Sequence, residues 1–409
     1  MVPNFSDSHF NPHPHMEAFS TDTVIGVIGA GTMGRGIAQV AAARGHHVIV
    51  FDSDERILSD ALNALTRILA RLVEKGRLDA GANDEILGRI TFAHVKLDAL
   101  ASCGLVIEAI VEDLGIKKSV FAGLESVVAG EAVLATNTSS LSVTGIAAAC
   151  ERPERVAGVH FFNPAPLMPL VELIPGVLTA AETVARVRRL IDGWGKATVV
   201  AKDTPGFIVN RVARPFYGEA LRILEEGVAD VATIDWAMRE LGGFRMGPFE
   251  LMDLIGNDIN YKVTESVWTA FFYEPRYKPS FTQKRMVEAG RLGRKSGRGY
   301  YEQGPNAVHP APVKSPALGT KIRNRIVAML INEAVDAVFW KVASPEDIDL
   351  AMTKGVNYPK GLLRWADEIG LDTVLFRLTA LYEEYREDRY RPSPLLRRMV
   401  RKDQRFYDG

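Results

Sequence analysis

The stretch VIGVIGAGTMGRGIAQVAAARGHHVIVFD, residues 24–52, decides how the first part of this 409-residue chain folds. Residues 24–28 are mostly β-branched, which predicts a buried parallel strand. A helical pattern follows, with Ile37, Val40 and Ala41 on one face, and Gly45 ends it. Residues 47–51 predict a second strand. The stretch therefore predicts a strand–helix–strand unit of a parallel sheet.

The turn between the first strand and the helix reads Gly29-Ala30-Gly31-Thr32-Met33-Gly34. Glycines at these positions allow a tight turn and a close approach of the backbone to a pyrophosphate at the helix N-terminus. Asp52 follows the second strand, 18 residues after Gly34, where its carboxylate can bind a ribose 2′-hydroxyl. The whole context favours a dinucleotide site over a coincidental turn.

The charges after the second strand bear on the choice of dinucleotide. Asp52 and Asp54 would repel a 2′-phosphate, and Ser53 adds no positive charge. This favours NAD over NADP. Arg56 is the nearby residue whose positive charge would favour NADP.

Two further predicted strands end in polar residues. Residues 105–109 are followed by Glu112 and Lys117, and residues 132–136 are followed by Asn-Thr-Ser-Ser at 137–140. The carboxyl ends of parallel strands face the ligand crevice of such a sheet. Ser139 is therefore a candidate site residue.

A second informative stretch is RVAGVHFFNPAPLMPLVELIP, residues 155–175. Two short apolar strands flank an Asn-Pro turn, which can bring His160 and Glu172 into contact. A histidine held by a carboxylate is an oriented general base. The alternative is a satisfied core histidine and a surface glutamate.

A leucine-rich helical stretch, residues 57–87, carries the basic residues Arg67, Arg71, Lys75 and Arg77. Such a cluster is usually a solvated helix face. The other interpretation is that a phosphate-bearing substrate lies against it.

From residue 207 onward the chain loses its strand-like runs and reads as helices, with a helix start predicted at Thr204-Pro205. Asn210 follows an apolar entry, so its side chain is a candidate for inward placement. This segment recurs at an offset of 114, which indicates a duplicated helical unit. The matching pairs are Asn210/Asn324, Arg211/Arg325, Glu219/Glu333, Asp235/Asp349, Gly247/Gly361, Asp253/Asp367 and Asp258/Asp372.

Composition excludes several classes of protein. The net charge of −1 gives no electrostatic case for binding nucleic acid or an anionic membrane, and no apolar run is long enough for a transmembrane helix. Cys103 and Cys150 have no metal or redox spacing and fit free thiols in a cytoplasmic protein. His9, His13 and His15 lie in a tail that we expect to be flexible rather than metal-binding.

Taken together, these motifs resemble the L-3-hydroxyacyl-CoA dehydrogenase family over roughly residues 23–302. The motifs that carry the resemblance are GAGTMG at 29–34, EAIVE at 108–112, NTSS at 137–140, HFFNP at 160–164, KDTPGF at 202–207, NR at 210–211, MGPF at 246–249 and KSGRGY at 295–300. The number and order of these motifs make the match specific.

The resemblance implies a role for each motif. It implies a base at His160 with Glu172 as its partner, and substrate hydrogen bonds from Ser139 and Asn210. Lys75 matches a family lysine that contacts the CoA phosphates, although Ile68 replaces a hydroxyl residue expected nearby. The residues that the resemblance places near NAD are Gly29, Gly31, Thr32, Met33, Gly34, Asp52, Glu112, Lys117, Ser139, Asn163 and Lys295.

The predicted fold is an α/β Rossmann-type domain followed by an all-α domain in two tandem copies. The expected divisions are a tail at 1–22, the NAD-binding domain at 23–203, copy 1 at 204–303, a linker at 304–319 and copy 2 at 320–409. Single-copy members of the family dimerise through their helical domains, so we expect the two copies to pack as a pseudo-twofold pair. The chain would then be a monomer, or would associate through another surface.

The predicted function is NAD-dependent oxidation of a (S)-3-hydroxyacyl-CoA to the 3-oxoacyl-CoA, and its reverse. One alternative within this chemistry is oxidation of 3-hydroxyadipyl-CoA, as in two-copy members of phenylacetate breakdown. Another is a dehydrogenase for a free β-hydroxyacid, but those families use a catalytic lysine instead of a His/Glu pair. A third is a non-catalytic, crystallin-like NAD-binding protein.

Overall fold

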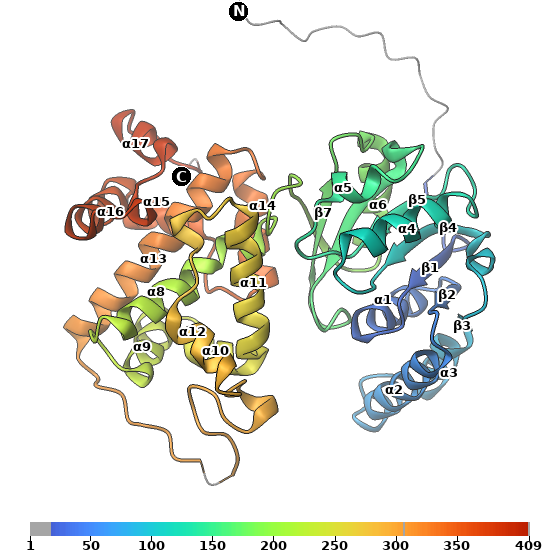
Figure 1. The fold of residues 1–409 in the computed structure, drawn as a ribbon, viewed down its shortest axis with the longest axis horizontal. Helices are drawn as coiled ribbons and strands as arrows, with labels where there is room; N and C mark the ends of the chain where they lie inside the picture. Colours follow the sequence, from blue (N-terminus) through green and yellow to red (C-terminus); the bar gives the residue numbers. More distant parts are fainter. Residues whose placement is uncertain (1–17, 306, 408–409) are drawn as a thin grey trace, which may run out of the picture.

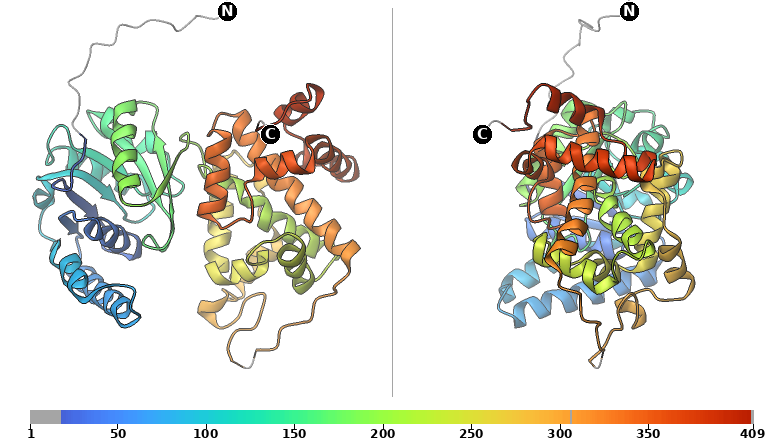
Figure 2. Two further views of the ribbon diagram at one scale, coloured as in Figure 1. Left: turned by 180° about the vertical axis from the view of Figure 1, so that it is seen from behind. Right: turned by 90° about the vertical axis from the view of Figure 1, so that its left-hand side faces the viewer.

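The computed structural model describes residues 18–305 and 307–407 and shows a sheet-containing part joined to a helical part (Figure 1). The three tail histidines, His9, His13 and His15, lie outside the described residues. The two parts stand side by side, and the same division is visible from behind (Figure 2).

The first part is an eight-stranded sheet of order β3-β2-β1-β4-β5-β6-β7-β8. Strands β1 to β6 are parallel, β7 is antiparallel to β6, and β8 is parallel to β7. The strands are β1 (Val24–Ile28), β2 (Val48–Phe51), β3 (Ile90–Ala93), β4 (Cys103–Glu108), β5 (Val133–Thr136), β6 (Val156–Phe161), β7 (Leu170–Pro175) and β8 (Ala197–Val200). The Rossmann-type prediction is confirmed.

Helices cover this sheet and shield its apolar strands from water. They are α1 (Thr32–Ala43), α2 (Glu55–Glu74), α3 (Ala80–Gly88), α4 (Leu114–Glu125), α5 (Val143–Ala147) and α6 (Ala181–Gly193). The prediction of one helical stretch over 57–87 was wrong, because the chain breaks between α2 and α3. Gly76 has a φ of 63°, and the Asp79 side chain accepts hydrogen bonds from the first amides of α3.

The helical part contains both copies of the repeat. Copy 1 holds α7 (Val209–Val212), α8 (Arg214–Glu225), α9 (Val231–Trp236), α10 (Pro248–Ile255), α11 (Asn257–Ala270) and α12 (Phe281–Glu288). Copy 2 holds α13 (Pro316–Phe339), α14 (Pro345–Gly355), α15 (Leu362–Ile369), α16 (Leu371–Tyr385) and α17 (Pro394–Arg401). The predicted helix start at Thr204-Pro205 was wrong. Gly206 and Phe207 have φ of 73° and 47°, which no α-helix accommodates, so α7 begins at Val209.

The two copies pack against each other through α8 and α13, and reciprocal ion pairs join them. The Arg211 guanidinium lies 2.6 Å from the Glu333 carboxylate, and the Arg325 guanidinium lies 3.0 Å from the Glu219 carboxylate. Each arginine and each glutamate is related to its counterpart by the offset of 114. A pseudo-twofold arrangement of two copies requires this reciprocity.

Each copy also contains the same buried aspartate cap. Asp235 accepts hydrogen bonds from two amides at the start of α10 and from the Tyr301 hydroxyl. Asp349 accepts them from two amides at the start of α15 and from the Tyr407 hydroxyl. Tyr407 therefore closes the cap of copy 2 as Tyr301 closes that of copy 1.

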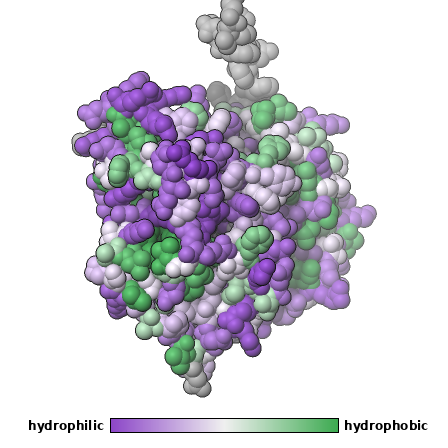
Figure 3. Space-filling model, turned by 60° about the vertical axis from the view of Figure 1, so that its left-hand side comes forward, coloured by the Kyte–Doolittle hydropathy of each residue, from purple (hydrophilic) through white to green (hydrophobic). Residues whose placement is uncertain are grey.

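Hydrophobic residues on the face shown in Figure 3 form separate patches among hydrophilic ones. No helix within the described part of the chain is long and apolar enough to cross a bilayer. In that same part, no cluster of His, Cys, Asp and Glu side chains could hold a metal ion.

Glu333 is fully buried, and it binds Arg211, Arg276 and the Tyr277 hydroxyl. We predict that Glu333→Ala lowers the free energy of unfolding by about 3–5 kcal/mol, because two buried arginines lose their shared carboxylate. Urea denaturation followed by circular dichroism measures this. The control is Glu288→Ala, whose exposed partner Lys284 lies 3.7 Å away, with an expected change below about 0.5 kcal/mol. Equal effects of the two substitutions would contradict the prediction.

Candidate active site

The glycine-rich turn leaves an open space in front of the N-terminus of α1. Gly29 has a φ of 93°, and a Cβ on Gly34 would lie 1.8 Å from the Gly29 carbonyl oxygen, so neither position accepts a side chain. A Cβ on Gly31 would meet no atom within 4 Å, and no side chain caps the helix. The first amides of α1 thus face open space, which fits the pyrophosphate of a dinucleotide.

Asp52 lies at the end of β2 and faces this turn. Its carboxylate accepts hydrogen bonds from the Ala30 amide at 2.9 Å and from the Asp54 amide at 3.1 Å. Arg56 is the nearby cation that would favour NADP. Its guanidinium donates a hydrogen bond to the Asp54 carboxylate at 2.8 Å, and this bond lowers the pKa of the Asp54 carboxyl. The acidic character of the site is therefore kept, which fits a free ribose hydroxyl.

Two glutamates and one lysine meet where β4 and β5 end. The Lys117 ammonium is 1% exposed and lies 2.6 Å from Glu108 and 3.3 Å from Glu112. Glu112 also accepts hydrogen bonds from the Thr138 hydroxyl at 2.6 Å and from the Ser139 amide at 2.9 Å. Burial raises the pKa of Glu112, but the Thr138 hydrogen bond and the Lys117 charge together bring it below its ordinary value.

This network fixes the backbone at Ser139, and it includes a residue that the sequence analysis missed. Glu108 is fully buried, and it accepts hydrogen bonds from Lys117 and from the Thr136 hydroxyl. The sequence feature that could have predicted Glu108 is its place as an acidic residue at the end of the otherwise apolar strand β4.

The predicted pair, His160 and Glu172, faces each other across the antiparallel strands β6 and β7. The distance from His160 Nδ1 to Glu172 Oε2 is 2.7 Å, and the two residues are 5% and 0% exposed. The other carboxylate oxygen, Oε1, accepts the amides of Ile208 at 3.1 Å and Val209 at 2.9 Å. Glu172 therefore joins the histidine to the start of α7, where Asn210 is the next residue.

The loop between β6 and β7 is held from both sides. Its Ala165 and Pro166 contact the position of Gly36 on α1, where an added Cβ would lie 3.3 Å from each residue. On the other side, the Lys196 ammonium donates hydrogen bonds to the carbonyl oxygens of Ala165 at 2.6 Å and Met168 at 2.8 Å. Burial and the charge of Arg44 lower the pKa of Lys196 to about 8. This loop carries Asn163, whose peptide bond to Pro164 is cis.

The remaining candidates lie on other elements. Lys295 belongs to the short turn Arg294–Ser296 and pairs with Asp258, at the start of α11, at 2.6 Å. Lys75 caps the C-terminal end of α2, and Ile68 in the same helix is 41% exposed. No hydrogen bond in the described chain joins Lys75 or Lys295 to the His160–Glu172 pair.

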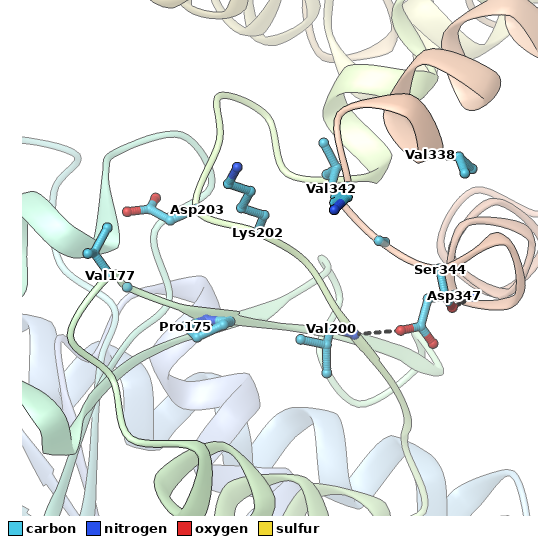
Figure 4. Close-up of a pocket in the computed structure, with 12 residues that line it drawn as sticks. Pro175, Val177, Val200, Lys202, Asp203, Val338, Val342, Ser344 and Asp347 are labelled. Carbon is cyan, nitrogen blue, oxygen red and sulfur yellow. Dashed lines mark hydrogen bonds between the residues drawn. The ribbon is translucent and has the colours of Figure 1, made fainter. Parts of the chain in front are cut away.

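A pocket of about 640 Å³ lies away from these residues, between the ends of β7 and β8 and the α13–α14 connection (Figure 4). The Val200 amide donates a hydrogen bond to Asp347 at its edge, at 3.1 Å. Asp203, which also lines it, is occupied by the amides of Val143 and Thr144. None of the candidate site residues lines this pocket, so we do not assign the chemistry to it.

Comparison with known proteins bears on this site. The family model of the 3-hydroxyacyl-CoA dehydrogenase NAD-binding domain matches residues 24–204, and that of the C-terminal domain matches 206–303 and again 322–405. The 3-hydroxyadipyl-CoA dehydrogenase of Escherichia coli K12 is 41% identical over 91% of this chain and 96% of its own. The human mitochondrial hydroxyacyl-coenzyme A dehydrogenase is 40% identical over 68% of this chain and 90% of its own.

Solved structures agree. The crystal structure of 3-hydroxybutyryl-CoA dehydrogenase from Escherichia coli K12 superimposes with a TM-score of 0.87 and 40% identity, over 94% of this chain and 99% of that one. The fold and the site thus define an NAD-dependent oxidoreductase that acts on a hydroxyl group. More narrowly, the chain belongs to the 3-hydroxyacyl-CoA dehydrogenase family, in the form with two C-terminal domains.

We predict that Lys196→Met weakens NADH binding about tenfold, because the loop that carries Asn163 loses a cation shared by its carbonyl oxygens. Fluorescence titration with NADH measures the dissociation constant. The matched control is Lys314→Met on an exposed lysine before α13, which should leave binding unchanged. If both variants bind NADH like the wild type, Lys196 does not position this loop.

Proposed function

We propose that this chain oxidises a (S)-3-hydroxyacyl-CoA to the 3-oxoacyl-CoA, and catalyses the reverse reaction, with His160 as general base. The observation that carries the proposal is the 2.7 Å contact between His160 Nδ1 and the buried Glu172 carboxylate. A fully buried carboxylate against an imidazole is the arrangement of an oriented base.

The contact assigns different tasks to the two ring nitrogens. With the Nδ1 proton donated to Glu172, the lone pair of Nε2 is left to accept a proton from the substrate hydroxyl. Glu172 then stabilises the imidazolium that forms. In the reverse direction the imidazolium returns the proton to the oxygen of the alcohol, so a lower pH favours the reduced product.

Ser139 and Asn210 orient the substrate in this proposal. The Ser139 backbone is fixed by Glu112, and Asn210 directly follows the amide that binds Glu172. Both positions are thus held by carboxylates of the same site, so the substrate oxygens can be fixed relative to His160.

NAD supplies the hydride chemistry when it is bound. The residues that would hold it are Gly29, Gly31, Thr32, Met33, Gly34, Asp52, Glu112, Lys117, Ser139, Asn163 and Lys295. The open space at Gly31 and the acidic end of β2 support this placement. We assign Lys75 to the phosphates of CoA, since a cation at the exposed end of α2 can reach a bound anion.

The proposal extends to the state of the chain in the cell. Because copy 2 already packs on copy 1, we propose a functional monomer, with association through another surface as the alternative. The free, buried thiols of Cys103 and Cys150 support a cytoplasmic location. The relatives are named for both a monocarboxylic and a dicarboxylic acyl group, and none of the contacts described above distinguishes the two.

The test of the proposed function is NADH consumption with acetoacetyl-CoA. We predict turnover by the wild type and a loss of kcat of about 10²–10⁴-fold in His160→Ala, since general base catalysis contributes this much. NADH binding should persist in the variant. A wild type that binds NADH but reduces neither acetoacetyl-CoA nor a six-carbon 3-oxoacyl-CoA would instead indicate a binding protein without catalysis.

A second prediction concerns the dinucleotide. We expect the wild type to bind NADH at least about 50-fold more tightly than NADPH, because Asp52 and Asp54 repel a 2′-phosphate. Asp52→Ala should reduce this ratio. It should also weaken the binding of both dinucleotides, because the Ala30 amide loses its acceptor. Equal affinities for the two dinucleotides in the wild type would overturn the assignment of NAD.

A further inference from the structure

Arg214, in the first turn of α8, is a buried cation without a carboxylate partner. Its side chain is 7% exposed. Its Nε donates a hydrogen bond to the Asn210 carbonyl oxygen at 2.9 Å, and its Nη1 donates one to the Thr264 hydroxyl at 3.2 Å. Across residues 18–305 and 307–407, no aspartate or glutamate lies within 4 Å of this guanidinium, and its electrostatic neighbours are Tyr217 and Tyr358.

Three other buried arginines of the helical part are neutralised by close ion pairs, and a fourth, Arg222, donates to the carbonyl oxygens of Gly218 and Lys278 and lies within the electrostatic reach of Glu226. The Arg211, Arg276 and Arg325 guanidinium groups each lie within 3.1 Å of a glutamate. A buried guanidinium keeps its charge and costs stability unless an anion compensates it. Arg214 is therefore a site where an anion would be bound strongly.

The duplication inside this chain provides a control for the residues around Arg214. Offsets of 114, and of 113 after the shared motifs Glu-Pro-Arg-Tyr at 274 and Glu-Asp-Arg-Tyr at 387, relate the two copies. Four buried polar residues of copy 1 correspond to four buried apolar residues of copy 2. The pairs are Arg214/Ala328, Asn260/Val374, Thr264/Leu378 and Gln283/Leu396.

In copy 1 these polar residues form one cluster. Gln283 Nε2 donates hydrogen bonds to the Asn260 side-chain oxygen at 2.7 Å and to the Thr264 hydroxyl at 3.1 Å, and Thr264 in turn accepts from Arg214. Since copy 2 fills the same positions with apolar side chains, the fold does not require polar groups there. The cluster in copy 1 therefore serves something other than packing.

Space and an unused donor adjoin the guanidinium. A small cavity of about 10 Å³, room for one water-sized group, is lined by Arg214, Tyr217, Thr264 and Gln283 among others. The Tyr358 hydroxyl, which also lies within the electrostatic reach of Arg214, is buried and has no hydrogen-bond partner. A donor without an acceptor thus lies near a guanidinium without a carboxylate partner.

The position of Arg214 relates this cluster to the His160–Glu172 pair. Glu172 binds the Val209 amide, Asn210 follows, and Arg214 binds the carbonyl of Asn210 one helical turn further on. One turn advances about 5.4 Å along the axis, which is about the span of a few methylene groups. A chain held at its C3 by Asn210 would thus bring a terminal group a few carbons away close to Arg214.

We propose that Arg214 binds the distal carboxylate of a dicarboxylic 3-hydroxyacyl-CoA, and that this contact sets the acyl specificity of the enzyme. The inference rests on the proposed function. A guanidinium can donate two parallel hydrogen bonds to a carboxylate, one oxygen of which would enter the small cavity, and the pair would neutralise the buried charge. Thr264 holds the guanidinium in position and is itself bonded to Asn260 and Gln283.

The experiment compares two substrates of equal length, 3-oxoadipyl-CoA and 3-oxohexanoyl-CoA, which differ only in a terminal carboxylate or methyl group. The measured quantity is the ratio of their kcat/KM values in the NADH-dependent reduction. We expect the wild type to prefer the dicarboxylic substrate, and Arg214→Met to lower the ratio by about 30-fold or more, mainly through KM. Arg214→Lys, which keeps the charge but not the paired donors, should give an intermediate ratio.

The control is Arg222→Met, which makes the same change at another buried arginine of α8, one that donates hydrogen bonds to the carbonyl oxygens of Gly218 and Lys278. It removes a buried cation as the Arg214 variant does, but about two helical turns further from Asn210, so it should change the ratio by less than about threefold. Circular dichroism verifies that each variant is folded, and if Arg214→Met is not, Arg214→Lys still reports on the ratio.

A wild type that reduces neither substrate overturns the proposed function. Equal kcat/KM values of the wild type for 3-oxohexanoyl-CoA and 3-oxoadipyl-CoA would overturn only the role of Arg214. So would a ratio that Arg214→Met leaves unchanged.

Discussion

The Glu172 carboxylate is the group on which the rest of the site depends. One oxygen holds His160, and the other holds the amides of Ile208 and Val209, where the sheet-containing part meets the helices. A fully buried carboxylate needs all of these partners, because an unpaired charge in this position would be strongly destabilising. His160 and the start of α7 are therefore fixed by the same residue, which ties the position of the proposed base to the arrangement of the two parts.

The two helical copies have diverged in what they contribute. Both keep the reciprocal ion pairs and the aspartate caps, which maintain the packing of α8 against α13. Copy 1 supplies the amides that bind Glu172, and it has polar residues where copy 2 has apolar ones. The comparison within one chain distinguishes the residues that both copies share from those that copy 1 alone carries, since the fold is common to both copies.

Local sequence patterns predicted most of the strands, the glycine-rich turn and the His160–Glu172 contact, because each depends on neighbouring residues or on residues twelve apart in one hairpin-like unit. They did not predict β3, the break between α2 and α3 or the later start of α7. At the last two places, backbone at positive φ interrupts the helical pattern. Glu108 and Lys196 were also missed. Their partners come from other elements, and no spacing in the sequence shows a contact of that kind.

The sequence by itself determined the class of fold, the duplication and the pairing of His160 with Glu172, because periodicity, repeats and short motifs are local properties of the chain. Only the tertiary structure decided which charges are compensated. Arg211 and Arg214 stand three residues apart, and both are buried arginines at the start of the helical part. Arg211 meets Glu333 from the other copy, whereas Arg214 meets a carbonyl oxygen, a hydroxyl and the Tyr217 ring. Whether a buried charge stabilises the fold or awaits a ligand depends on the partners that folding brings to it.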